Sequence, residues 1–367
     1  MEDNFKPTLS LLDASMIVAG SMIGSGIFIV SADMMRQVGS AGWLIAIWLF
    51  TGFLTLAAAL SYGELSAMYP KAGGQYVYLK ESWNKLTGFL YGWSLFTVIQ
   101  TGTIAAVGVA FAKFAGYFFP VFELDEKNCL ATIGIVKLYP AQFLSIAIIF
   151  LLTFINTKGV NGGKTIQTMF TFTKILALLA LILLGFFLAF DVEIWRSNWQ
   201  NAWQIKQFTK GIGFQHQQGI AIMGLFAAAM VGSVFSSDAW NNITFIAGEV
   251  KNPQKNIGLG LLLGTGVVTL LYILTNVMYL GVLSNDEIAF AANDRVGVAA
   301  ASKIFGETGT YILVALIMIS TFGCINDMIL LGAIVYYTMA NDELFFKISN
   351  YKRINSDGEF AQHKTSG

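Results

Sequence analysis

The sequence predicts an all-α polytopic membrane protein, and three observations support this fold class. The 367 residues are 55% hydrophobic and only 12% charged, with a mean hydropathy of +0.63, whereas about a quarter of residues are charged in soluble domains. Windows of about 20 apolar residues, long enough to cross a bilayer as helices, recur along the chain. Most charged residues lie between these windows. The formal net charge of zero argues against a nucleic-acid partner.

Eight membrane spans are predicted from these windows. They cover approximately residues 9–30, 42–63, 86–117, 139–156, 166–190, 219–247, 257–283 and 308–338. Lysine and arginine are more frequent on the side of the N-terminus, which predicts a cytoplasmic N-terminus in the plasma membrane. The first apolar run is too long for a signal-peptide core, so it is interpreted as a retained span.

Two spans contain weak helix formers near their centres. Gly20-Ser-Met-Ile-Gly-Ser-Gly-Ile-Phe28 interrupts the first, and Gly232-Ser233 with Ser236-Ser237-Asp238 interrupts the sixth. Alone, the first motif is more typical of close helix packing. Paired interruptions at corresponding positions of two repeats instead indicate a transporter binding site. Amides freed by such a break favour a carboxylate ligand.

This pairing predicts five regions. Residues 1–8 form a cytoplasmic N-terminus and 9–190 a first repeat of five helices. Residues 191–218 form an extracellular or periplasmic loop, in which Trp195, Trp199 and Trp203 at i, i+4, i+8 predict one face of an interfacial helix. Residues 219–338 hold the first three helices of an inverted second repeat, and 339–367 form a cytoplasmic tail.

Ionisable residues inside spans are expensive, about 2.5–3.5 kcal/mol each on insertion scales, so each is a functional candidate. Lys174 lies deep in the fifth span, and either pairs with a carboxylate or helix carbonyls or takes part in transport coupling. Asp238 either caps an internal break or forms an ion pair. Asp327 in the eighth span could cap, pair with Lys174, or face a water-filled vestibule. Lys113 lies near a span end and can reach the interface.

No enzyme class is indicated, because the sequence shows no catalytic triad, metal cluster or phosphate loop. Cys129 and Cys324 match no disulfide framework or zinc spacing. His216 and His363 lie in polar segments. We therefore expect neither a metal nor a cofactor.

Four motifs resemble the amino acid–polyamine–organocation (APC) superfamily, in particular its L-type amino acid transporter branch. They are the Gly20–Phe28 motif, Tyr69-Pro-Lys-Ala-Gly-Gly-Gln-Tyr-Val-Tyr78, Phe235-Ser-Ser-Asp-Ala-Trp-Asn-Asn-Ile-Thr-Phe-Ile-Ala-Gly-Glu-Val-Lys-Asn-Pro253, and the pair Ser320-Thr-Phe-Gly-Cys-Ile-Asn326 and Met339-Ala-Asn-Asp-Glu-Leu-Phe-Phe346. The resemblance implies a LeuT-type inverted-repeat fold with the first and sixth helices broken. It also implies secondary transport of amino acids by exchange or proton linkage, without sodium.

The resemblance further implies individual roles. Ser25, Gly26 and Ile27 would bind the substrate carboxylate, and Ile23 and Gly24 would line the break. Carbonyls of Phe235 and Ser236 would receive the α-ammonium, with Phe235 capping the substrate and Ser237 and Asp238 beside it. Lys174 would stand in place of a sodium ion and bridge Gly20 to Ser320 and Thr321. An acidic residue at Asp238 occurs in some members that accept cationic side chains, although it could merely cap the second half-helix.

The chain departs from the resemblance in having eight spans rather than twelve. It is therefore either a fragment or a truncated product, and the rival hypothesis is a non-transporting protein or ligand sensor that keeps a half-site. Cys129 lies in the loop where animal L-type members link to a glycoprotein heavy chain, but one cysteine is weak support and no such partner is expected. The expected partners are an amino acid substrate and the lipid bilayer.

Overall fold

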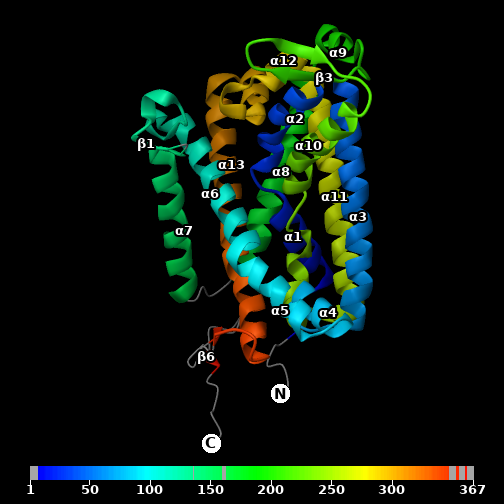
Figure 1. Ribbon diagram of the computed structural model, residues 1–367, viewed down its shortest axis with the longest axis vertical. Coiled ribbons are helices and arrows are strands. Elements are labelled where there is room, and N and C mark those ends of the chain that lie inside the picture. The colour runs from blue at the N-terminus through cyan, green and yellow to red at the C-terminus, as the bar shows by residue number, and fades with distance from the viewer. Residues whose placement is uncertain (1–6, 135, 159–162, 347–352, 355–359, 362–367) are drawn as a thin grey trace, which may run out of the picture.

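The fold is taken from a computed structural model, which describes residues 7–134, 136–158, 163–346, 353–354 and 360–361. Long helices form an elongated bundle, with the end of α13 near one end of it and helices α2, α9 and α12 at the other (Figure 1). Among the described residues, seven helices are long and apolar enough to cross a membrane, and Leu11–Met22 is a shorter apolar helix. The prediction of an all-α polytopic membrane protein is confirmed.

The α-helices alternate with short 3-10 helices and three two-stranded antiparallel sheets, β1–β2, β3–β4 and β5–β6. In chain order the elements are α1 Leu11–Met22, η1 Gly26–Phe28, α2 Val30–Val38, α3 Ala41–Met68, α4 Gln75–Ser82, α5 Lys85–Ser94, the π-helical turn η2 Leu95–Ile99, α6 Gln100–Phe118, η3 Pro120–Phe122, η4 Glu126–Asn128, β1 Ala131–Ile133, β2 Val136–Leu138, α7 Pro140–Lys158, α8 Gly163–Leu188, α9 Val192–Trp199, β3 Lys206–Thr209, β4 Gly213–His216, α10 Ala221–Ser236, η5 Trp240–Glu249, α11 Pro253–Val282, α12 Asn285–Ala289, η6 Ala292–Asp294, α13 Val296–Asn341, β5 Arg353–Ile354 and β6 Phe360–Ala361.

Both predicted interruptions are present. The first span stops as an α-helix at Met22, continues through η1, and resumes as α2. The sixth span stops at Ser236, passes through Ala239 in the left-handed conformation with φ +68°, and continues as η5. The second half of this span is a 3-10 helix with a kink at Ile246, not the α-helix that the sequence predicted.

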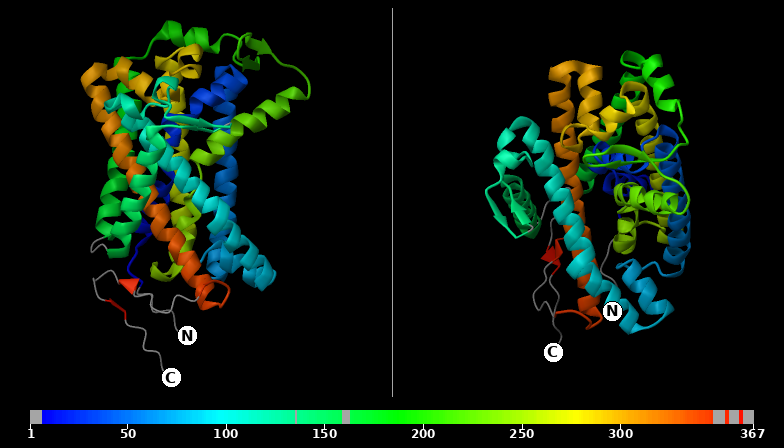
Figure 2. Two further views of the ribbon diagram at one scale, coloured as in Figure 1. Left: turned by 60° about the vertical axis from the view of Figure 1, so that its left-hand side comes forward. Right: turned by 45° about the horizontal axis from the view of Figure 1, so that its top comes forward.

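The broken helix α1 lies at the centre of the bundle, between α11 and α8 (Figures 1 and 2). Glycines on α11 allow the two backbones to approach closely. A side chain at Gly260 would begin 3.0 Å from the Cβ of Ala14, and one at Gly264 would begin 2.6 Å from the Cβ of Val18. This small-residue spacing is typical of helix interfaces in membranes. It fixes α1, and with it the first break, against α11.

Three predictions about elements need correction. Helix α9 ends at Trp199, so Trp203 does not continue its face but contacts Trp43 with ring centroids 6.1 Å apart. The same connection contains the β3–β4 hairpin, which hydropathy did not predict. The eighth span is part of a 46-residue helix, α13, that begins at Val296 and has non-helical backbone at Gly306. Most of the predicted tail, and residues 1–6 of the predicted N-terminal segment, lie outside the described residues.

Candidate functional site

The first break leaves four backbone carbonyls at the end of α1 without partners inside the helix. The last intrahelical bond here runs from the amide of Ile23 to the carbonyl of Ala19. An α-helix end always leaves its final carbonyls unpaired, and burying them unpaired is costly. In this protein each of the next four carbonyls is met by a side chain from another helix.

The four donors come from α8, α11 and α13. They are Lys174 Nζ to the Gly20 carbonyl at 2.9 Å, Cys324 Sγ to the Ser21 carbonyl at 3.6 Å, Tyr272 Oη to the Met22 carbonyl at 2.8 Å and Ser320 Oγ to the Ile23 carbonyl at 3.2 Å. The thiol is the weakest donor of this set. Because every donor lies 150 or more residues away along the sequence, the shape of the break depends on tertiary packing.

The two breaks touch each other. A side chain at Gly26 would begin 2.3 Å from Ser236 Oγ and 3.1 Å from Ser236 Cα, so only glycine fits between the backbones. Tyr272 also links the breaks, because its hydroxyl lies 3.2 Å from the Ser236 carbonyl as well as 2.8 Å from that of Met22. One hydroxyl proton serves both acceptors, so Tyr272 can donate fully to only one at a time.

A small cavity lies where the breaks meet. Its lining comes from both breaks and from α6 and α13, and consists of Ser21, Met22, Ser25, Gly26, Thr103, Val107, Phe235, Ser236, Asp238, Ala239, Cys324 and Met328. The hydroxyls of Ser21 and Ser236 are buried and have no hydrogen-bond partner in the described part of the chain. Its volume of about 30 Å³ is room for about two water molecules. An amino acid therefore requires the cavity to expand.

Five of the predicted substrate-site residues line this cavity, namely Ser25, Gly26, Phe235, Ser236 and Asp238. Four others, Ile23, Gly24, Ile27 and Ser237, are buried beside it without lining it. The amides of Ser25, Gly26 and Ile27 make no hydrogen bond to the backbone among the described residues. The amides of Ser25 and Gly26 and the two free hydroxyls thus belong to residues that line one cavity, which can accept a polar ligand.

The sequence missed several cavity residues. Thr103, Val107, Cys324 and Met328 lie on α6 and α13, and their types are ordinary for apolar spans. Tyr272 was missed for the same reason. The sequence does contain one pattern that could have pointed to Tyr272. Tyr272, Asn276 and Tyr279 form a polar face on the otherwise apolar helix α11, and Asn276 accepts a 2.6 Å hydrogen bond from Ser31.

The expected bridge made by Lys174 is only half present. Lys174 reaches Gly20, but it makes no hydrogen bond to Ser320 or Thr321 among the described residues. Ser320 donates to Ile23, and Thr321 donates to Ile317 of its own helix. The contact of Lys174 with α13 is instead at Gly323, whose side chain would begin 3.7 Å from Nζ.

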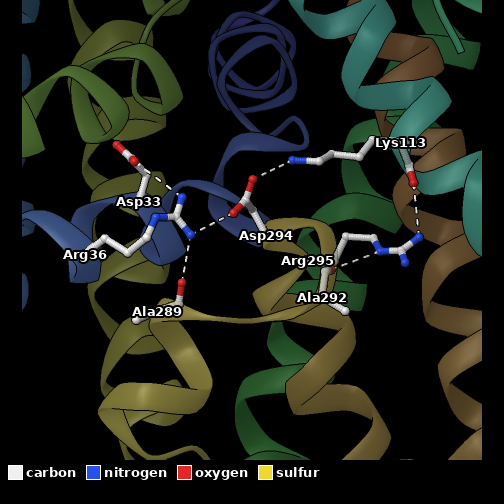
Figure 3. Close-up of polar contacts among 7 residues, drawn as sticks. All are labelled: Asp33, Arg36, Lys113, Ala289, Ala292, Asp294 and Arg295. Atoms are coloured by element: carbon white, nitrogen blue, oxygen red, sulfur yellow. Dashed lines mark hydrogen bonds and ion pairs between the residues drawn. The ribbon is translucent and has the colours of Figure 1, made fainter. Parts of the chain in front are cut away.

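A second polar cluster (Figure 3) lies at the end of the bundle that carries α2 and α12 (Figure 1). Asp294 accepts hydrogen bonds from Arg36 on α2 and from Lys113 on α6, both at 2.8 Å. Beside it, the buried Arg295 donates to Glu123 at 3.0 Å and to the Lys113 carbonyl at 3.2 Å. Lys113, which was expected to reach the membrane interface from a span end, is thus part of an ion-pair network.

The charges around Asp294 set its protonation. Burial raises the pKa of Asp294, but the hydrogen bond and charge of Lys113, with the charge of Arg36, outweigh burial and hold this pKa below its ordinary value of 3.8. Asp294 is thus ionised at neutral pH and ties α2 to α6.

Comparisons with known proteins agree with this architecture. Residues 9–359 match the family model described as amino acid permease. The chain is 28% identical to the large neutral amino acids transporter small subunit 2 of Homo sapiens, over 92% of this chain and 58% of that protein. It is 28% identical to the Asc-type amino acid transporter 1 of Mus musculus, over 92% and 59%, and 30% identical to the serine/threonine exchanger SteT of Bacillus subtilis (strain 168), over 92% and 69%. The chain thus spans somewhat under two thirds of the length of the two mammalian relatives. Because the family model matches nearly all of this chain, the chain belongs to the amino acid permease family.

Proposed function

We propose that this protein carries amino acids across a membrane by secondary active transport, by exchange or by proton linkage. The observation that carries the proposal is the meeting of two broken helices at a cavity lined by unpaired amides and hydroxyls. Broken helices within a membrane expose backbone groups only where these line a binding cavity or are satisfied by protein. The names of the relatives, which are amino acid transporters and an exchanger, support the same substrate class.

The two ends of an amino acid would bind to different breaks. The free amides of Ser25, Gly26 and Ile27 are donors, and suit the α-carboxylate. The carbonyls of Phe235 and Ser236 at the end of α10 are acceptors, and suit the α-ammonium. Ser236 already accepts a long bond from Tyr272 at 3.2 Å, and its second lone pair is available to a ligand.

Asp238 would select the substrate side chain. It lines the cavity just beyond the ammonium end, and makes no ion pair among the described residues. A carboxylate there would favour a cationic side chain, such as that of lysine, ornithine or arginine.

Lys174 would make transport independent of sodium. Its ammonium donates to the Gly20 carbonyl at the negative end of the α1 dipole, where a bound cation would otherwise be stabilised. The remaining proposals follow from the sequence: a plasma-membrane location, a cytoplasmic N-terminus, and no heavy-chain partner at Cys129.

Proteoliposomes containing the purified full chain test the transport proposal. We expect labelled amino acid to enter when unlabelled amino acid or a proton gradient is supplied, and to be unaffected by replacing sodium with potassium. Absence of flux under both driving forces would overturn transport. Thermal stabilisation by amino acids without flux would instead favour a ligand-binding protein.

The Asp238→Asn variant tests substrate selection. Removing the charge should weaken competition by arginine and lysine, while leaving competition by neutral amino acids nearly unchanged. Asp33→Asn, which removes an exposed carboxylate on α2, is the matched control. Equal competition by arginine in the wild type and in Asp238→Asn would contradict the assigned role.

A further inference from the structure

Asp327 is a carboxylate inside the bundle that has no partner among the described residues. It lies on the membrane-spanning helix α13, and only 7% of its surface is exposed. It makes no hydrogen bond and no ion pair with the described part of the chain. Burying an ionised carboxylate without such partners costs several kcal/mol. Buried ionisable groups of this kind in membrane proteins mark ion or proton pathways.

The position of Asp327 on α13 directs it to the seam between α1 and α8. Ser320, Gly323 and Asp327 are spaced i, i+3, i+7 and therefore share one face of the helix. Ser320 on this face contacts the end of α1, and Gly323 contacts the ammonium of Lys174 on α8. Asp327 therefore lies one helical turn beyond the Lys174 contact, and the charge of Lys174 acts on it.

Lys174 has unused hydrogen-bonding capacity. Its ammonium has three N–H donors, and among the described residues it uses one, to the Gly20 carbonyl. An under-used ammonium and a carboxylate without a partner in the described part of the chain thus lie on the same face of α13, the ammonium beside Gly323 and the carboxylate one turn farther on. The Asp327 carboxylate is thus the candidate for a second acceptor of Lys174, besides the Gly20 carbonyl that it uses in this structure.

We propose that Asp327 is a proton-binding site, and that its protonation decides which of these acceptors Lys174 uses. With the proton bound, Asp327 is neutral, Lys174 stays on Gly20 as observed, and the first break keeps its substrate-binding shape. With the proton released, the carboxylate draws Lys174 away, and the Gly20 carbonyl loses its donor. This inference rests on the proposed function, and it makes the coupling ion a proton.

The proton balance is simple. A proton from water forms an O–H bond on the Asp327 carboxylate, and on release this bond breaks and the proton returns to water. Lys174 keeps its own proton throughout. Because the proton and the substrate favour the same state, each raises the affinity for the other, and they cross together.

Other titratable groups near this seam are few. Among the described side chains around this part of α13, they are Lys174 on α8, Cys324 on α13 itself and Asp238 after α10. The polar neighbours from α6 and α7 are uncharged, namely Gln100, which donates to the Met328 carbonyl, and Asn156, which donates to Asn326. Of the two carboxylates, Asp327 is the one that lies a single helical turn from the Lys174 contact at Gly323.

The test uses Asp327→Asn, which imitates the protonated state permanently. In wild-type proteoliposomes, one proton moving with each substrate supports about ten-fold accumulation per unit of pH difference. We expect Asp327→Asn to lose this accumulation and to retain exchange at equal pH, because the empty carrier can no longer release a proton. Substrate affinity should fall with rising pH in the wild type and stay constant in the variant. Asp33→Asn, which removes an exposed carboxylate, should behave as wild type.

Infrared spectroscopy gives a second readout that needs no transport. Substrate binding should increase the protonated-carboxyl band of the wild type at alkaline pH, and produce no such change in Asp327→Asn.

Gradient-driven accumulation by Asp327→Asn, or loss of its exchange together with accumulation, would overturn the proposal. If the wild type exchanged amino acids but did not respond to the pH gradient, the proposed proton site would be overturned and the proposed transport function would stand. A wild type with no flux at all would overturn the proposed function, and the infrared change would still decide the role of Asp327.

Discussion

Gly26 is the residue at which the two broken helices touch. A methyl group here would begin 2.3 Å from Ser236 Oγ and 3.1 Å from Ser236 Cα, and the backbone atom cannot rotate away. We expect Gly26→Ala to destabilise the protein by about 1–3 kcal/mol, as overpacking does, and to abolish ligand binding. Thermal unfolding in detergent with and without amino acids measures both effects.

The matched control for this substitution is Gly224→Ala on α10. A side chain there meets nothing within 4 Å, and alanine stabilises a helix interior by up to about 1 kcal/mol relative to glycine. Equal melting temperatures for Gly26→Ala and Gly224→Ala would show that the breaks do not touch.

Among the described side chains, Tyr272 is the one that bonds to both breaks. Tyr272→Phe keeps the ring but removes the hydroxyl, so the Met22 and Ser236 carbonyls lose a buried donor. We expect a loss of about 1–3 kcal/mol in stability, together with weaker substrate binding. Tyr279→Phe serves for comparison, because Tyr279 is equally buried on the same helix, but its hydroxyl makes one long bond of 3.4 Å to Ile27. A larger effect at Tyr279 would contradict this ranking.

At the scale of elements, Asp294 joins η6 to α2 and α6. Its pKa is lowered in the folded protein, so its contribution to stability is fully present above the ordinary value of 3.8, and is lost as the pH falls through the lower folded value. We expect wild type to lose its stability advantage over Asp294→Asn as the pH drops below about 4. Thermal unfolding of both proteins across this range measures the difference.

Asp33→Asn is the control for this experiment, because Asp33 also pairs with Arg36, but at 3.3 Å and with an exposed side chain. Its effect should be small, as for most surface ion pairs. If the advantage of wild type over Asp294→Asn were the same at acidic and neutral pH, the cluster would not hold these elements together.

At the scale of the whole molecule, the described conformation holds a cavity that is too small for an amino acid. The space of about 30 Å³ excludes an amino acid, and the Asp294 cluster ties the bundle together at one end. At the other end, Asp342 on the turn after α13 accepts 2.7 Å bonds from Tyr76 and Lys80 on α4. The proposed transport would therefore require the protein to open at one end at a time.

Cys324 reports this opening, because it lines the cavity and is 3% exposed. In a Cys129→Ser background, we expect a maleimide to label Cys324 slowly, and bound amino acid to slow the labelling further. Mass spectrometry of the peptide gives the rate, with Cys129 in a Cys324→Ser background as the more exposed control. If Cys324 were labelled as fast as Cys129, and if amino acid did not change its rate, the result would contradict the burial of Cys324 in the cavity.

Much of this architecture was predictable from local sequence. Hydropathy located the spans, because a bilayer demands about 20 apolar residues in each helix. Gly20–Phe28 and Ser236–Asp238 located the breaks, because glycine and serine propagate a helix poorly. The Trp203 position and the β3–β4 hairpin were not predicted, since neither depends on hydropathy alone.

The sequence by itself determined the membrane class, the two broken helices, and the presence of Lys174 and Asp327 among apolar residues. Only the tertiary structure decided which side chains meet the carbonyls of Gly20 to Ile23, and that Lys113 pairs with Asp294. The physical reason is that helix propensity and hydropathy act over a few residues, whereas a buried carbonyl is satisfied by whichever donor the packing brings near. Here those donors are 154 to 303 residues away along the chain.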